Sequence, residues 1–295
     1  MVETRDGRHQ SCSQGSGNVK LDAHQHFWRY SAQEYPWIPK GSALQRDWLP
    51  QDLATQQAPL GFDGSIAVQA RQTLEETRWL LSLADQNPRI LGVVGWVDLR
   101  SEELPEQLAE FAARPKFVGV RHVVQDEPDD LFMLGEEFLR GVRQLRAYSL
   151  TYDLLIFPRQ LPAASEVVSR FPQQQFVLDH IAKPSIKDRR LEPWLTEIRD
   201  LAQYPNVACK LSGLVTEADH QHWREEDLLP YLDIVTEAFG PARLMIGSDW
   251  PVCLLAGDYA RPLNVVLSWA KKFSAAEQAG IFGDNCARFY LARRT

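Results

Sequence analysis

Short apolar runs alternate with longer amphipathic stretches along most of the chain. Residues 64–70 are an apolar run bounded by glycine, which predicts a buried strand. In residues 73–87, which follow, apolar side chains recur at helical spacing. Thr73 with Glu76 three residues later forms a capping-box pattern, so the helix is expected to begin there.

The same alternation continues to the end of the chain. Strands are predicted over residues 19–23, 64–70, 90–97, 117–124, 150–157, 176–180, 207–211 and 244–248. Helices are predicted over residues 73–87, 102–113, 131–148, 161–171, 192–204, 225–239, 262–273 and 275–291. Strands this apolar are typical of parallel sheets buried on both faces. The pattern predicts a single-domain (β/α)8 TIM barrel over residues 19–295. A doubly wound open sheet is the alternative, but no Gly-rich phosphate loop follows the first strand.

Two segments depart from this alternation. Residues 1–18 are polar and rich in Gly, Ser and Gln, so we predict a disordered lead-in; they lack the apolar centre of a signal peptide. Residues 28–61 are rich in aromatic residues and proline, which predicts an ordered, irregular loop. Such a loop can bury its aromatic side chains on the barrel rim, wall a substrate pocket, or do both.

Composition narrows the classes of partner. The net charge of −7 disfavours a nucleic-acid or anionic-membrane partner, and no apolar run reaches the roughly 18 residues of a membrane helix. The four cysteines lie far apart without C-x-x-C spacing, which is typical of reduced thiols in a cytoplasmic protein. We therefore expect a small-molecule partner, with a homo-oligomer left open.

Polar residues gather where the predicted strands end. His24 and His26 follow the first strand and, one residue apart, would share a face, as a divalent-metal or proton-handling site requires. The other predicted strands end with or carry Gln69, Arg71, Trp96, Asp98, Arg121, His122, Tyr152, Asp153, Asp179, His180, Lys183, Lys210, Ser212, Ser248, Asp249 and Trp250. Buried charge is costly unless it is paired or used, and barrel active sites lie at this end of the strands. The pattern therefore predicts an active site here.

Seven motifs, in order along the chain, resemble the amidohydrolase superfamily. They are DAHQHFW at 22–28, VQAR at 68–71, GVRH at 119–122, LDHIAKP at 178–184, KLSG at 210–213, IGSDWP at 246–251 and GDNCARFY at 283–290. The resemblance is closest to the amidohydrolase 2 branch, which contains lactonases of sugar acids and of 2-pyrone-4,6-dicarboxylate. It implies a hydrolase of carbohydrate catabolism that opens a sugar lactone, such as L-fucono-1,5-lactone or L-rhamnonolactone, to the aldonic acid.

Lactone hydrolysis needs an activated water and stabilised charge on the carbonyl oxygen. The resemblance implies Asp249 as general base. It also implies that His24, His26, His180 and Asp249 hold one divalent ion, Zn²⁺, or that the imidazoles polarise the carbonyl without a metal. The substrate-contact candidates are Gln69, Arg71, Arg121, His122, Tyr152 and Trp28, with Lys183 and Lys210 as weaker ones. A binuclear centre is disfavoured because the predicted fifth strand has no histidine.

Other functions remain open from the sequence. A lactonase for an aromatic dicarboxylate would need several converging arginines, and only Arg71 and Arg121 stand clearly at strand ends. Decarboxylation, which relatives in the superfamily also perform, would need a metal and no attacking water. A binding protein that had lost the chemistry is disfavoured because Asp249, His24 and His26 are all present.

Overall fold

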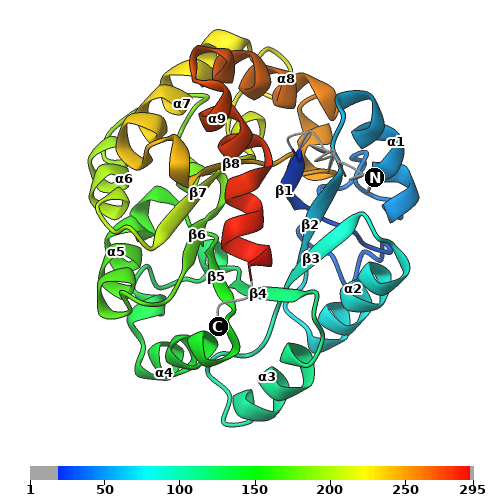
Figure 1. Ribbon diagram of the computed structural model, residues 1–295, viewed down its shortest axis with the longest axis vertical. Coiled ribbons are helices and arrows are strands. Elements are labelled where there is room, and N and C mark those ends of the chain that lie inside the picture. The colour runs from blue at the N-terminus through cyan, green and yellow to red at the C-terminus, as the bar shows by residue number, and fades with distance from the viewer. Residues whose placement is uncertain (1–18, 293–295) are drawn as a thin grey trace, which may run out of the picture.

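The computed structural model describes residues 19–292, which form one barrel of eight parallel strands (Figure 1). The strands are β1 (Leu21–Gln25), β2 (Gly64–Val68), β3 (Ile90–Gly95), β4 (Phe117–His122), β5 (Thr151–Leu154), β6 (Phe176–Leu178), β7 (Val207–Leu211) and β8 (Leu244–Ile246). They pair in sequence order from β1 to β8. Backbone bonds then join the two ends: the amide of Asp249 donates to His24 O at 2.8 Å, and that of His26 to Trp250 O at 2.6 Å. The predicted (β/α)8 barrel is confirmed, and the open sheet is excluded.

Helices surround the strands, and all but the last, short one bury side chains in the hydrophobic core shared with the strands (Figure 1). They are α1 (Pro50–Gln57), α2 (Leu74–Gln86), α3 (Leu104–Ala112), α4 (Glu136–Leu145), α5 (Leu161–Arg170), α6 (Trp194–Ala202), α7 (Glu225–Phe239), α8 (Ala260–Trp269) and α9 (Ala275–Ala279). The predicted cap is present, since Thr73 Oγ1 accepts a hydrogen bond from the Glu76 amide at 3.2 Å. Among the described residues no helix is long and apolar enough to cross a bilayer.

Several predicted strands are too long, and the reason bears on the site. β6 ends at Leu178 and β8 at Ile246, whereas the apolar pattern predicted strands to residues 180 and 248. Beyond these points the backbone turns, and both His180 (φ 53°) and Asp249 (φ 56°) are left-handed. Non-glycine residues in this region are uncommon and often lie at functional sites.

Two helix predictions are corrected. Residues 131–148 are not one helix: a short turn, Phe132–Leu134, precedes α4, and Gly135 with ψ 137° separates them. Helix α1 lies inside the segment predicted to be irregular. Its sequence is mostly polar, so hydrophobic periodicity missed it, although Pro50 stands at its first turn and Asp52 accepts a bond from the Leu49 amide.

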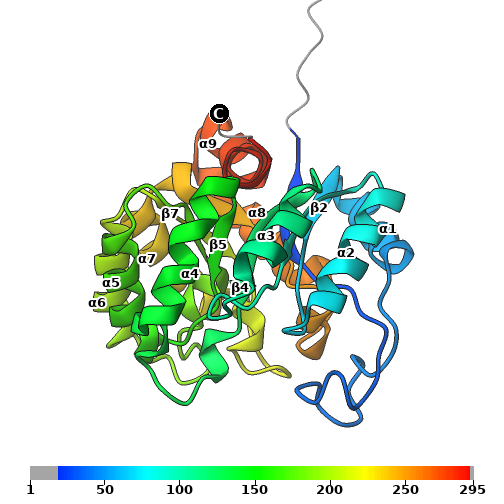
Figure 2. The ribbon, with the colours of Figure 1, turned by 90° about the horizontal axis from the view of Figure 1, so that it is seen from below.

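The two ends of the barrel differ. The chain remains helical after α9, with π-helical turns at Gly280–Asp284 and Ala287–Leu291, and this segment covers the end where the strands begin (Figures 1 and 2). There Phe289 and Tyr290 pack with apolar side chains of the strands. The loop of residues 28–49, hereafter the rim loop, lies at the opposite end (Figure 2). Access to the interior is therefore from the carboxyl ends of the strands.

Candidate active site

A cavity of about 650 Å³ opens at the carboxyl ends of the strands. Seven predicted site residues line it: His26, Gln69, Arg71, Arg121, His180, Lys183 and Asp249. The rim loop adds Gln33, Glu34, Trp37 and Pro39 to the same wall. The rim loop therefore forms part of the cavity wall, as predicted. The volume of the cavity suits a small-molecule ligand.

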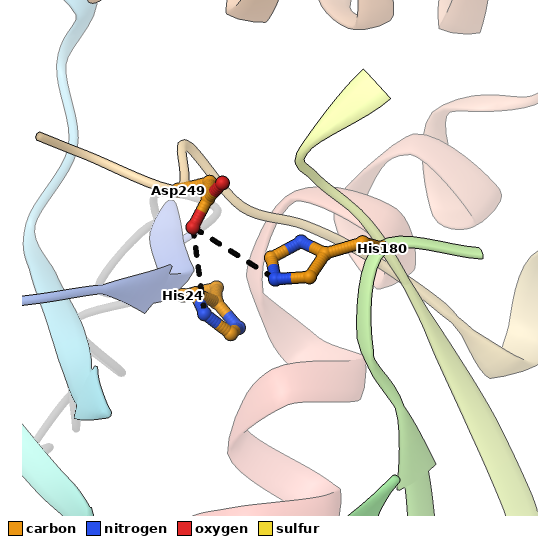
Figure 3. A group of neighbouring side chains, drawn as sticks. All are labelled: His24, His180 and Asp249. Carbon is orange, nitrogen blue, oxygen red and sulfur yellow. Dashed lines mark ion pairs between the residues drawn. The ribbon is translucent and has the colours of Figure 1, made fainter. Parts of the chain in front are cut away.

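Three side chains from different strands converge at the inner end of the cavity, where His180 and Asp249 line it and His24 is fully buried (Figure 3). His24 comes from β1, His180 follows β6 and Asp249 follows β8, and their ligand atoms lie within 4.8 Å of one another. Asp249 Oδ1 lies 3.7 Å from His24 Nε2 and 3.8 Å from His180 Nε2. His26 Nε2 lies 3.3 Å from the same oxygen and 3.1 Å from His24 Nε2. All four predicted catalytic residues are thus neighbours.

The other nitrogen of each imidazole is already engaged. His26 Nδ1 lies 2.8 Å from Val68 O, and His180 Nδ1 lies 2.9 Å from Ser212 Oγ. His24 Nδ1 lies 3.3 Å from Asp179 Oδ1. Partners of this kind fix the ring orientation of metal-binding histidines and leave Nε2 as the ligand atom.

These donor atoms fit a divalent ion. A tetrahedral zinc ion with bonds of about 2.0–2.1 Å has donor atoms about 3.3 Å apart. Oδ1 of Asp249 lies 3.3–3.8 Å from Nε2 of His24, His26 and His180, and Nε2 of His24 and His26 are 3.1 Å apart. The ligand atoms of His24, His180 and Asp249 all lie close to one another, and we call these three residues the triad. His26 is close to His24 and Asp249.

Burial sets the charges in the triad. It lowers the pKa of His180 to about 4 and that of His24 well below its ordinary value, so both imidazoles are neutral at neutral pH. Burial alone would raise the pKa of Asp249, but attraction to His180 and contacts with His26 and His24 outweigh it, and the pKa lies below its usual range. An ionised carboxylate among neutral imidazoles is the protonation state that metal binding requires.

The backbone around Asp249 is held on both sides. The carboxylate of Asp22, fully buried on β1, accepts hydrogen bonds from the amide of Ser248 at 2.9 Å and from its hydroxyl at 2.6 Å. Ser248 Oγ in turn accepts from the Trp250 amide at 3.0 Å, and Tyr259 donates to Asp22 at 3.1 Å. These bonds support the left-handed turn that points Asp249 at the histidines.

His180 lies in a run of left-handed residues, 180–183, directly after β6. Gly213, itself left-handed, follows β7 beside it, and a Cβ there would come within 2.5 Å of His180 Nδ1. Glycine at this position therefore makes room for the imidazole ring.

A buried ionic network underlies the triad. Lys210 on β7 is fully buried, with Nζ 2.6 Å from Asp153 Oδ2, 2.9 Å from Asp179 Oδ1 and 3.2 Å from His24 Nδ1. Arg121 Nη1 lies 2.9 Å from Asp179 Oδ2. Tyr290 OH donates to Asp153 at 2.6 Å. Lys210 is therefore a support of the site and does not line the cavity, unlike Lys183.

Three of the predicted substrate contacts lie behind the cavity wall. Tyr152 is buried with its ring edge-on to Phe138 at 5.7 Å, and it does not line the cavity. Trp28, the first residue of the rim loop, is buried, with its indole NH donating to Arg46 O at 2.9 Å. His122 is also behind the wall, 2.6 Å from Glu127 Oε1. The structure therefore brings Gln69, Arg71 and Arg121, but not these three, to the cavity.

The rim loop is fastened to the turn after β2. Arg71 Nη1 lies 2.5 Å from Glu34 Oε1, and the Trp37 indole NH donates to Ala70 O at 3.2 Å. The Glu76 carboxylate accepts hydrogen bonds from the amides of Arg71 at 2.7 Å and Ala70 at 3.0 Å. These bonds fix the turn after β2. Arg71 is thus both a cavity residue and a fastening for the loop.

Sequence reasoning missed Glu34, Glu127 and the role of Asp22. Asp22 could have been found, because a carboxylate inside a buried run two residues before His24 calls for a partner. Glu34 and Glu127 lie in polar loops and carry no local signal that distinguishes them from solvated side chains.

Comparisons with known proteins agree with this geometry. A family model described as amidohydrolase matches residues 21–291. The chain is 46% identical to a Burkholderia multivorans protein named L-fucono-1,5-lactonase, over 93% of this chain and 96% of that one. It is 39% identical to a Burkholderia ambifaria protein of the same name, again over 93% and 96%. A crystal structure of an amidohydrolase from Burkholderia multivorans with bound zinc has a TM-score of 0.89 and 45% identity, covering 93% of this chain and 100% of that chain. The family model matches nearly the whole barrel, and the family is the one that the seven motifs resemble. The chain therefore belongs to the amidohydrolase family.

Proposed function

We propose that this protein is a hydrolase that opens a sugar lactone, with L-fucono-1,5-lactone as the first candidate, to the aldonic acid. The proposal rests on the carboxylate of Asp249, which lines an open cavity and lies within 3.8 Å of three imidazole nitrogens. The identity to two proteins named L-fucono-1,5-lactonase supports the choice of substrate.

The reaction adds water across the ring ester. Asp249 accepts a proton from the attacking water and returns it to the ring oxygen as the C–O bond breaks. The guanidinium of Arg121, which lines the cavity 3.4 Å from His24 Nε2, supplies positive charge where the carbonyl oxygen becomes negative. The lactone loses one ester bond and gains a hydroxyl and a carboxylic acid, which releases its proton to the solvent as a carboxylate.

His24, His180 and Asp249, with His26 beside them, are the residues that would hold one divalent ion, and we propose zinc. When bound, such an ion lowers the pKa of water and polarises a carbonyl. The ligand set is the imidazole nitrogens of His24 and His180, with that of His26 nearby, and one carboxylate oxygen, a combination that zinc accepts.

Charge in the cavity favours a neutral substrate over an aromatic dicarboxylate. The cavity lining includes the cations Arg71, Arg121 and Lys183, and each already faces a carboxylate. Arg71 lies 2.5 Å from Glu34, Arg121 2.9 Å from Asp179, and Lys183 3.7 Å from Glu217. A dicarboxylate would have to compete with these carboxylates for each cation.

Acid release in a weakly buffered indicator solution tests the substrate. We expect L-fucono-1,5-lactone, or another of the L-rhamnono-, D-arabinono- and L-galactonolactones, to be hydrolysed with kcat/KM of about 10⁴ M⁻¹s⁻¹ or more. We expect little turnover of 2-pyrone-4,6-dicarboxylate. Hydrolysis of the dicarboxylate alone, or of no lactone by the folded, zinc-supplied protein, contradicts the proposal.

Metal analysis tests the zinc site independently of substrate choice. We expect one zinc per chain in the purified protein, loss of lactonase activity on chelation and its return with stoichiometric zinc. His24→Ala should lose the bound zinc, whereas His220→Ala, at an exposed histidine, should keep it. Full activity of chelated protein that contains no metal would show that the imidazoles act without an ion.

A further inference from the structure

The wall of the cavity formed after β4 holds a carboxylate that no step above uses. Glu127 follows the short turn Val124–Asp126 and lines the cavity with 23% of its side chain exposed. Its Oε1 lies 2.6 Å from Nε2 of His122, the last residue of β4. The imidazole of His122 thus fixes the carboxylate from one side, and the other side faces the cavity.

The contacts of His122 define which partner donates. The indole NH of Trp96, which can only donate, lies 3.4 Å from His122 Nδ1, so Nδ1 is the acceptor. Nε2 then carries the hydrogen and donates to Glu127. Burial lowers the pKa of His122, which keeps the imidazole neutral. His122 also stacks on Phe132 at a centroid distance of 4.9 Å, and this fixes the ring plane.

A carboxylate held by one neutral donor keeps most of its capacity to accept hydrogen bonds. An ionised carboxylate offers about four lone-pair sites and no hydrogen. The groups that it selects from a ligand are therefore hydroxyl donors, and it repels a second carboxylate. A sugar lactone carries ring hydroxyls of this kind.

We propose that Glu127 accepts a hydrogen bond from one ring hydroxyl of the substrate, and that His122 positions it for this task. Glu127 is then a specificity-determining residue, and His122 acts only through it. This inference rests on the proposed function, because it assigns a substrate group to the same cavity.

The test compares freshly prepared L-fucono-1,5-lactone with its 2-, 3- and 4-deoxy analogues on wild type and Glu127→Ala. A hydrogen bond to a charged group predicts a loss in kcat/KM of about 10- to 100-fold for Glu127→Ala on the parent lactone, mainly through KM. Removal of one particular hydroxyl should cost wild type a similar factor. That same removal should cost Glu127→Ala almost nothing, while the other two removals cost both proteins equally.

Two further variants separate recognition from folding. His122→Phe keeps a ring on Phe132 and should weaken discrimination at the same hydroxyl, whereas Glu136→Gln, exposed in the first turn of α4, should behave as wild type. Equal losses for all three deoxy analogues in wild type and Glu127→Ala would overturn the role of Glu127 while leaving lactone hydrolysis intact. Absence of hydrolysis of the parent lactone by wild type would instead overturn the proposed function and, with it, this inference.

Discussion

Asp249→Asn is expected to lower kcat for lactone hydrolysis by about 10²- to 10⁴-fold, the usual contribution of a general base. The amide has nearly the same size, but it cannot accept a proton from water at neutral pH. Asp249 Oδ1 also lies within 3.3–3.8 Å of three imidazole nitrogens, so the substitution removes a negative charge that contacts all three rings.

The assay is run at saturating zinc, so that weaker metal binding does not account for the loss. The fold should survive, because the backbone amide of residue 249 still donates to His24 O and Asp22 still holds Ser248. Asp200→Asn, at an exposed aspartate of α6, is the matched control and should retain full activity. An Asp249→Asn protein with more than about a tenth of wild-type kcat lies outside the range for a general base and would assign proton transfer to another group.

Lys210→Met is expected to lower the free energy of unfolding by about 3–5 kcal/mol, the cost of removing one partner of a buried ion pair. Methionine can occupy similar space, but Asp153 and Asp179 would then lie in the barrel interior without the ammonium group between them, and either unpaired buried charge or uptake of a proton costs free energy. All three side chains are fully buried, so water cannot replace the lost contacts.

Urea unfolding of wild type and variant measures this difference. Lys272→Met is the matched control: the Lys272–Asp233 pair is about half exposed, and its loss should change stability by no more than about 1 kcal/mol. Tyr290→Phe, which removes only the hydrogen bond to Asp153, should cost about 1.5–3 kcal/mol and remains measurable if Lys210→Met does not fold. Equal stability of Lys210→Met and wild type would mean that the two carboxylates take up protons at little cost.

The sequence determined the barrel because its signal is local. Buried parallel strands are short apolar runs and the covering helices have one apolar face, so both periods can be read from the residues. The strand 207–211 and the helix 225–239 were predicted with their observed boundaries. The sequence also identified His24, His26 and Asp249 as candidate site residues, since burying polar side chains at the ends of strands costs free energy unless they are paired or used.

The tertiary structure decided which strand-end residues face the cavity. A period of two says that Tyr152 and Asp153 point to opposite sides of β5, but not which side is the interior; the barrel turns Asp153 toward Lys210 and Tyr152 toward the helices. The left-handed turns at His180 and Asp249 oppose local preference and persist because long-range bonds such as Ser248–Asp22 support them. Glu127 lies in the cavity wall because the chain after β4 turns there and His122 holds its carboxylate. Contacts such as that between Ser248 and Asp22 join residues far apart in sequence, and no local pattern encodes them.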